Sequence, residues 1–449
     1  MVRNTVVNID VERDLSSPIE PDNSQPPANL LVSLRRSRLA HPIVIVAWIS
    51  GVLIAINAPN YAALALIPIT LFLLVSKQPL LSGAILTSAL FTIFGAVGNF
   101  LYLGVIAIDV HTISTAMIFH LFFALGVYLG GLAVPRSVSQ PRPILQQLWA
   151  ILMLATIFLL IARFALNGTP LLNASGNRLE GISQLNPYLG LISGVLPIIT
   201  AYLPSYRGGL TTVLKFIVAF LVFLTGSRLL LAAVLVGYVY QYLRGRSDRK
   251  MTRSGRLVLL SLVGLALLIT AIVNIYSIRT TQNVTLTWQE RVQESTGTLG
   301  LITLVFGPSL FLAARNGLVV FELVQSGGLK PPGGFILGGL GHTLGITQDP
   351  ELWLTQALGF DPDSIGATAT PIWAGSTLDF GSTAIIVALA VGVLLGVWSQ
   401  RMPALSPWFS FGIVLSSYGS YLVSVQFLTA TIALTVVLWL GTQRIMEQR

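Results

Sequence analysis

The run Leu257–Tyr276 (LVLLSLVGLALLITAIVNIY) carries no charged residue and passes directly into the polar stretch Ser277–Ser295 (SIRTTQNVTLTWQERVQES). A helix of about 20 apolar residues spans a bilayer core of ~30 Å. The junction therefore predicts a transmembrane helix that leads into a long loop. That loop continues to Gly381, where the sequence becomes hydrophobic again. We expect a fold in which membrane spans flank one large outer loop.

The composition of the whole chain indicates the same class. Hydrophobic residues make up 54% of the 449 residues and charged residues only 10%, whereas soluble domains carry about 25% charged residues. In lipid, only helices or closed barrels satisfy the backbone polar groups. Because the apolar runs are continuous and do not alternate, they predict an all-α polytopic membrane protein. The chain has no cysteine, which excludes disulfides and thiolate metal sites.

Basic residues predict the orientation, because cytoplasmic loops carry an excess of lysine and arginine. Arg35, Arg36 and Arg38 precede the first span, and Arg244–Arg256 is the most basic loop. The net charge of +9 is therefore interpreted as an orientation signal and not as a nucleic-acid-binding surface. This pattern predicts about twelve spans with both termini in the cytoplasm. The expected organisation is a disordered tail (1–39), spans (40–277), an outer loop (278–381), further spans (382–442) and a cytoplasmic tail (443–449).

Arginines on the outer side need a separate explanation, because topology disfavours them there. Arg228 and Arg315 each adjoin or lie within a hydrophobic helix and are expected at the membrane surface. An unpaired guanidinium is costly there unless it meets an anion, and its planar fork suits phosphate oxygens. We therefore expect these two side chains to face a functional cavity. For Arg291 and Lys330, ordinary loop salt bridges are the preferred interpretation.

Other polar residues within or near the apolar segments are interpreted one by one. Arg163 and Lys215 are expected to snorkel to the membrane surface, and His120 is expected to hydrogen-bond between helices. His342 is the only histidine of the outer loop. Histidine is the commonest general base near neutral pH, so His342 is a candidate for that role. Asp361-Pro362-Asp363 is interpreted as a turn in preference to half of a metal site.

Two segments of the outer loop predict short helices. Gly300–Gln325 contains two apolar pieces broken at Gly307-Pro308. They are too short to span a bilayer and are expected at its surface or over a cavity. Asp349-Pro350 predicts the N-cap and first turn of a helix that ends at Gly359.

Three short stretches resemble the oligosaccharide repeat-unit polymerases (the Wzy, or O-antigen polymerase, group), which are related to the O-antigen ligases. They are Gly168–Leu172 followed by Arg178, Leu224–Arg228, and Thr370–Gly381. Many members have an acidic residue where this chain has Ala374-Gly375-Ser376, so the role of that acid is not carried over.

The resemblance implies a GT-C-like fold and a glycosyltransferase that polymerises polyprenyl-diphosphate-linked repeat units on the outer face of the cytoplasmic membrane. It assigns the diphosphate to Arg178, Arg228 and Arg315, with Arg279 behind them, and assigns activation of the acceptor to His342. Arginines stabilise a leaving diphosphate without a metal, so no cofactor is expected. The implied partners are lipid-linked oligosaccharides, membrane lipids, a flippase and a chain-length regulator.

Two alternatives remain open at this point. A ligase-type transferase would use the same chemistry on a different acceptor. A multi-pass lipid or polysaccharide transporter would more often carry charges near the midplane and related halves. A metal-dependent polyprenyl-phosphate glycosyltransferase is disfavoured, because such enzymes usually carry acids in the first outer loop and Asn57–Asn60 has none.

Overall fold

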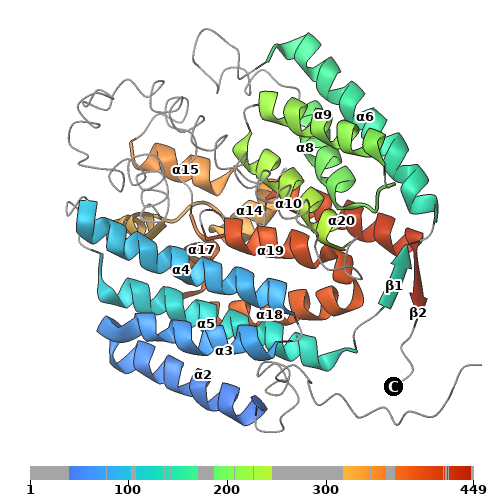
Figure 1. The fold of residues 1–449 in the computed structure, drawn as a ribbon. Coiled ribbons are helices and arrows are strands. Elements are labelled where there is room, and N and C mark those ends of the chain that lie inside the picture. The colour runs from blue at the N-terminus through green and yellow to red at the C-terminus, as the bar shows by residue number, and fades with distance from the viewer. Residues whose placement is uncertain are drawn as a thin grey trace, which may run out of the picture.

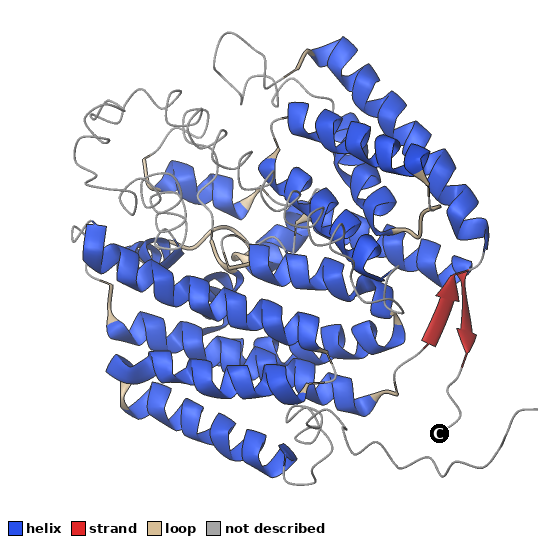
Figure 2. Ribbon diagram, in the orientation of Figure 1, coloured by secondary structure: helices blue, strands red, loops and turns tan. Residues whose placement is uncertain are grey.

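The computed structural model describes residues 40–445, apart from 77, 103–107, 136–137, 142, 170–186, 207, 226, 245–316, 344–345, 347, 360–369, 418, 420–421 and 423. Almost all of this part of the chain is helical (Figures 1 and 2). The N-terminal helices are α2 (Ala40–Asn57), η1 (Pro59–Ala65), α3 (Leu66–Val75), α4 (Pro79–Tyr102), α5 (Val110–Ala133) and α6 (Pro143–Asn167). They are followed by α8 (Pro187–Tyr202), α9 (Gly209–Leu224), α10 (Arg228–Arg244), an unlabelled helix Gly317–Gly327, α14 (Ile336–Thr343) and α15 (Pro350–Ala357). The C-terminal part contains α17 (Ile372–Phe380), η2 (Gly381–Thr383), α18 (Ala384–Arg401), η3 (Pro403–Leu405), α19 (Ser406–Leu415) and α20 (Val425–Gly441).

Several of these helices have the length and composition of membrane spans. Four are long and apolar enough to cross a membrane, namely Pro79–Val97, Val110–Ala133, Ile144–Asn167 and Ile372–Arg401. Eight shorter apolar helices of 10–17 residues accompany them in the described part of the chain. The fold is therefore that of a helical membrane protein. The count of about twelve spans stays a prediction, and the predicted span Leu257–Tyr276 lies outside the described residues.

The centre of the bundle is the close crossing of α5 and α18. Both helices carry a G-x-x-x-G pattern, with Gly126 and Gly130 on α5 and Gly392 and Gly396 on α18. A Cβ on Gly392 would lie 2.5 Å from the carbonyl oxygen of Phe123, so a larger residue does not fit there. In lipid, small residues at a crossing allow the dispersion contacts that hold two helices together. This pattern explains why α5 and α18 pack backbone to backbone.

A buried histidine connects α4 and α5. His120 Nδ1 lies 2.6 Å from the carbonyl oxygen of Ala116, and Nε2 lies 2.8 Å from Ser88 Oγ. Because a carbonyl only accepts, Nδ1 carries the proton and Nε2 accepts from the Ser88 hydroxyl. The interpretation of His120 as a helix-pairing residue is confirmed.

One end of the bundle carries a small β-ribbon, which the all-α prediction did not include. Strand β1 (Val138–Pro141) pairs antiparallel with β2 (Thr442–Ile445), with Val138 opposite Ile445. The ribbon forms because α5 and α20 lead into extended polar segments that lie side by side (Figure 1). The segment after α5 and the segment after α20 thus lie on the same side, as the basic-loop pattern predicts.

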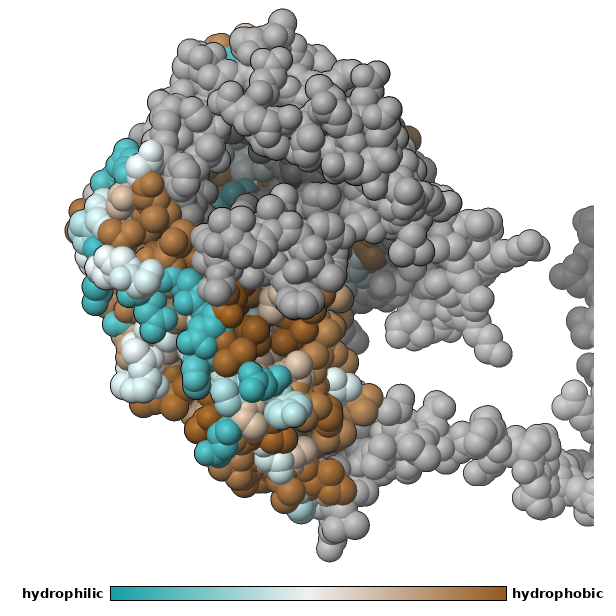
Figure 3. Space-filling view, turned by 90° about the vertical axis from the view of Figure 1, so that its left-hand side faces the viewer, coloured by the Kyte–Doolittle hydropathy of each residue, from teal (hydrophilic) through white to brown (hydrophobic). Residues whose placement is uncertain are grey.

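The opposite end carries a layer of short helices, which we call the outer layer. It comprises Gly317–Gly327, α14 and α15, and its core contains Val320, Val324, Phe335 and Leu354. Figure 3 views the molecule from this end, where hydrophilic and hydrophobic residues are mixed on the surface. The described part of the second apolar piece, from Gly317 onward, is therefore helical and packed, while the rest of that piece and all of the first piece lie outside the described residues.

Helix α15 begins at the predicted N-cap and ends at Ala357, two residues before the predicted end at Gly359. Asp349 Oδ1 accepts a hydrogen bond from Glu351 N at 2.9 Å, and Pro350 is the first helical residue. Gly359 follows with φ of 79°, a left-handed conformation that glycine adopts without strain. The local cap and stop signals in the sequence were sufficient to predict this element.

The last part of the predicted outer loop is helical. Residues 372–380 form α17, whose Trp373 and Ala374 are buried. Gly381, with φ of 57°, then turns the chain through η2 into α18. Helix α17 packs against both α5 and α14, so it connects the outer layer to the bundle.

Candidate functional site

Asp379 of α17 holds the outer layer on the bundle. Its carboxylate accepts hydrogen bonds from Phe335 N at 2.7 Å and from Ile336 N at 2.6 Å. These amides are at the start of α14, where backbone donors lack helical partners and negative charge is favoured. Gly334 has φ of 80°, and a Cβ there would lie 2.6 Å from Asp379 Oδ1. The glycine therefore lets the chain wrap closely around the carboxylate.

Two further carboxylates connect elements at this end. Glu322 Oε1 accepts from Asp109 N at 2.8 Å and from Thr112 Oγ1 at 2.5 Å, at the start of α5. Glu351 Oε1 accepts from Thr370 N at 3.0 Å, just before α17. These acids pair with backbone amides and a hydroxyl group, so they fix the outer layer in position.

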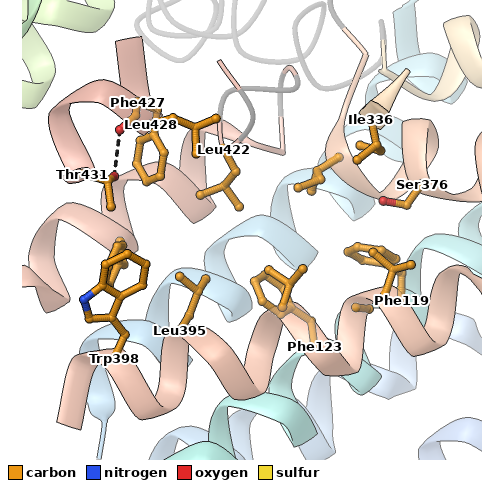
Figure 4. A pocket seen from close by; sticks show the side chains of 15 residues that line it. Phe119, Phe123, Ile336, Ser376, Leu395, Trp398, Leu422, Phe427, Leu428 and Thr431 are labelled. Carbon is orange, nitrogen blue, oxygen red and sulfur yellow. Dashed lines mark hydrogen bonds between the residues drawn. The ribbon is translucent and has the colours of Figure 1, made fainter. Parts of the chain in front are cut away.

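An apolar cavity of about 200 Å³ lies beneath the outer layer (Figure 4). Helix α18 provides one side of it through Val387, Ala388, Val391, Leu395 and Trp398. These residues lie three or four apart, apart from the adjacent first pair, and so follow one face of the helix over roughly 16 Å. Helix α5 contributes Phe119 and Phe123 beside α18, and Leu422 and Phe427 lie across the cavity from them (Figure 4).

The two ends of the cavity differ. Ile336 of α14 and Ser376 of α17 lie at the end beneath the outer layer, and Trp398 and Thr431 lie at the far end (Figure 4). The hydroxyl of Thr431 donates to the carbonyl oxygen of Phe427 at 2.7 Å and accepts from an indole N–H. A polar ligand would therefore lose its water without gaining partners. The lining instead suits a hydrocarbon chain.

The predicted phosphate-binding arginines are described only in part. Arg178, Arg279 and Arg315 lie outside the described residues. Arg228 is the first residue of α10, after a turn in which Ser227 Oγ accepts from Leu230 N at 3.4 Å. Its side chain lies outside the part of the structure that is described. A cluster of these arginines stays a prediction.

His342 lies in the last turn of α14, and its side chain is exposed. Ile336, which lines the cavity, is six residues earlier, about 9 Å along the helix and on a different face. The histidine is thus part of the outer layer and not part of the cavity wall. The predicted Asp361-Pro362-Asp363 turn lies outside the described residues. Within the described residues, no group of three or more histidines and acids could hold a metal ion.

Lys215 is half-buried in the first half of α9. Its Nζ donates to Ser205 Oγ at 2.8 Å and to Gln241 Oε1 at 3.0 Å. It also lies 5.9 Å from the ring centroid of Trp149 and 5.4 Å from that of Tyr238, where a cation is attracted to the ring faces. Ser205 lies between α8 and α9 and Gln241 lies near the end of α10, so the ammonium group is held at the ends of these helices, and its snorkelling stays a prediction.

Arg163 is buried between helices, contrary to the prediction that it snorkels. Its side chain is only 8% exposed, and Nη1 donates to Ser193 Oγ on α8 at 3.0 Å. The sequence does not show that α6 and α8 pack together, so the contact between Arg163 and Ser193 could not be predicted from it.

The cavity was not predicted from the sequence. Helix α18 is apolar on all sides, and Leu394, which is 65% exposed, is as hydrophobic as the cavity-lining Leu395. In a membrane protein both the lipid-facing and the core-facing residues are apolar, so hydrophobicity does not separate them. The G-x-x-x-G pairs at 126/130 and 392/396 were the one available signal for the α5–α18 contact.

Comparison with known proteins leaves the resemblance noted above untested, because no family model, curated protein or solved structure matches this chain.

Proposed function

We propose that this protein is a membrane glycosyltransferase that polymerises polyprenyl-diphosphate-linked oligosaccharide repeat units on the outer face of the cytoplasmic membrane. The observation that supports this function best is the apolar cavity directly beneath the outer layer. A lipid-linked sugar needs a hydrocarbon site and a polar site next to each other. The cavity supplies the first, and the outer layer lies where the second would be.

In this proposal the cavity positions the lipid tail and adds little to the binding affinity for the substrate. A polyprenyl tail leaves a bilayer that is as apolar as the cavity, so the transfer gains little free energy. Holding the first part of the tail between α18 and α20, however, fixes where the diphosphate emerges. Positioning of this kind converts an encounter between two lipids into a reaction between aligned groups.

The reaction would take place above the cavity. An acceptor hydroxyl oxygen forms a bond to the anomeric carbon while the bond from that carbon to the diphosphate breaks, and polyprenyl diphosphate leaves. In this proposal Arg178, Arg228, Arg279 and Arg315 stabilise the negative charge on the leaving diphosphate. His342 takes the proton of the hydroxyl. Helix α14 would couple the two sites, since it carries Ile336 at its start and His342 at its end.

A reconstituted assay tests the role of the cavity. The protein is placed in vesicles with a polyprenyl-diphosphate oligosaccharide, and products are separated by length. Val391→Trp fills the cavity and should reduce chain growth at least tenfold, because the tail can no longer take its position. Leu394→Trp is the matched control, since it lies on the same helix but is 65% exposed.

The outcomes separate the candidate functions. Normal growth with Val391→Trp, or equal losses in both variants, would contradict a role for the cavity. A ladder of lengths indicates a polymerase, and a single transfer to a different acceptor indicates a ligase-type enzyme. Movement of the lipid-linked sugar across the vesicle membrane without any new glycosidic bond would indicate a transporter.

A further inference from the structure

A polar site separate from the cavity lies near the outer ends of α6, α8 and α20. Arg163 is four residues before the end of α6, and Ser193 is in the outer half of α8. The guanidinium donates to Ser193 Oγ at 3.0 Å, and that hydroxyl donates to the carbonyl oxygen of Gly190 at 3.0 Å. Helix α20 lies next to this part of α8, because a Cβ on Gly194 would lie 2.7 Å from Gln426 Nε2.

The charge of Arg163 is not balanced within the described part of the chain. The side chain is more than nine-tenths buried, and its Nε is enclosed without a hydrogen-bond partner. Its one hydrogen bond goes to a neutral hydroxyl, and no described carboxylate pairs with it. An arginine remains charged in any protein environment, and a buried charge without a counterion costs several kcal/mol. The arrangement therefore calls for an anion.

The geometry of the free donors indicates which anion. The guanidinium carries five N–H donors. With Nη1 directed to Ser193 and Nε enclosed, the remaining N–H groups of Nη1 and Nη2 are the ones that can meet an anion. Such donors bind the tetrahedral oxygens of a phosphate through charge-assisted hydrogen bonds. Arg163 lies only four residues from the end of α6, and near the ends of membrane helices the abundant phosphates belong to lipids.

We infer that Arg163 and Ser193 bind the phosphate of a membrane lipid between α6, α8 and α20. This site is distinct from the cavity, since Gln426 faces α8 whereas Phe427, Leu428 and Thr431 face the cavity. The assignment does not depend on glycosyl transfer. The phosphate belongs either to a bulk phospholipid or to a polyprenyl diphosphate, and the two sources are separable by experiment.

The test measures lipid retention by native mass spectrometry of the delipidated protein. It uses a Val391→Trp background, so that the cavity does not contribute. The probes are phosphatidylglycerol, polyprenyl diphosphate and polyprenol, which has no phosphate. We expect retention of the two phosphate-bearing lipids and a loss of at least tenfold with Arg163→Gln. Arg401→Gln, an exposed arginine at the end of α18, is the control and should change nothing.

Each outcome decides the inference. Preference for polyprenyl diphosphate assigns the site to the carrier lipid, and equal retention of both phosphate-bearing lipids assigns it to bulk phospholipid. Unchanged retention in Arg163→Gln overturns the inference. If that variant does not fold, Arg163→Lys is used in its place. Lysine keeps the positive charge but lacks the planar guanidinium that binds two oxygens at once, so this variant should retain phosphate-bearing lipid more weakly than the wild type. Glu180 lies in the sequence between α6 and α8. A thermal loss in Arg163→Gln that is restored by adding Glu180→Gln would show that this carboxylate, and not a phosphate, neutralises Arg163, and would overturn the inference.

Discussion

Replacing Asp379 tests how the outer layer is attached to the bundle. The Asp379→Ala change removes two hydrogen bonds, of 2.7 Å to Phe335 N and 2.6 Å to Ile336 N. A hydrogen bond to a charged group contributes about 1.5–3 kcal/mol, so the pair contributes about 3–6 kcal/mol to holding α14 in place. Since each 1.4 kcal/mol is a factor of ten, local opening of α14 should become about 10²- to 10⁴-fold more frequent. Asp379→Asn retains one acceptor oxygen without charge and should lose roughly half of this free energy.

Amide hydrogen exchange of the protein in nanodiscs measures this opening. Peptides that cover α14 should exchange faster in Asp379→Ala, while those of α5 should keep their protection because the bundle stays folded. Asp349→Ala is the control: it removes one N-cap bond of 2.9 Å at α15 and should cost only about 1 kcal/mol. If α14 exchanges at the wild-type rate in Asp379→Ala, Asp379 does not hold the outer layer and the reasoning is wrong.

Two further substitutions probe the interior of the bundle. Gly392→Val should lower the thermal stability by about 1–3 kcal/mol or more, because its Cβ would lie 2.5 Å from the carbonyl oxygen of Phe123. Gly83→Ala, whose Cβ would lie 3.7 Å from its nearest neighbour, should not lower it, and equal melting temperatures for the two variants would argue against a tight crossing. Ser88→Ala removes the donor to His120 Nε2 and should cost about 1–3 kcal/mol, the penalty for an unsatisfied buried acceptor. The same variant combined with His120→Leu should recover part of that loss, and a purely additive result would show that the two side chains do not interact.

Much of the local structure of this chain could be predicted from its sequence. Length and hydrophobicity identify the membrane helices, since a bilayer core requires long apolar runs. The start of α15 at Asp349-Pro350 and the stop signal at Gly359 could be predicted, because helix caps depend on residues that are neighbours in the sequence. The pairing role of His120 was also correct.

Only the tertiary structure decided which side chains meet. Asp379 was predicted as part of a loop, yet it caps a helix 43 residues earlier in the chain. The sequence does not show that α8 supplies Ser193 to Arg163 or that α10 supplies Gln241 to Lys215. The cavity along α18 was not visible either, since its lining residues have the same character as those that face lipid.

The physical reason is the solvent. In water, an apolar stripe on a helix shows which side is buried. In a bilayer the burial of a side chain gains no hydrophobic free energy over contact with lipid, so the sequence determines that these helices span but not how they face one another. Packing, hydrogen bonding and the small residues at the crossing of α5 and α18 decide the orientation, and these act only between segments far apart in the chain.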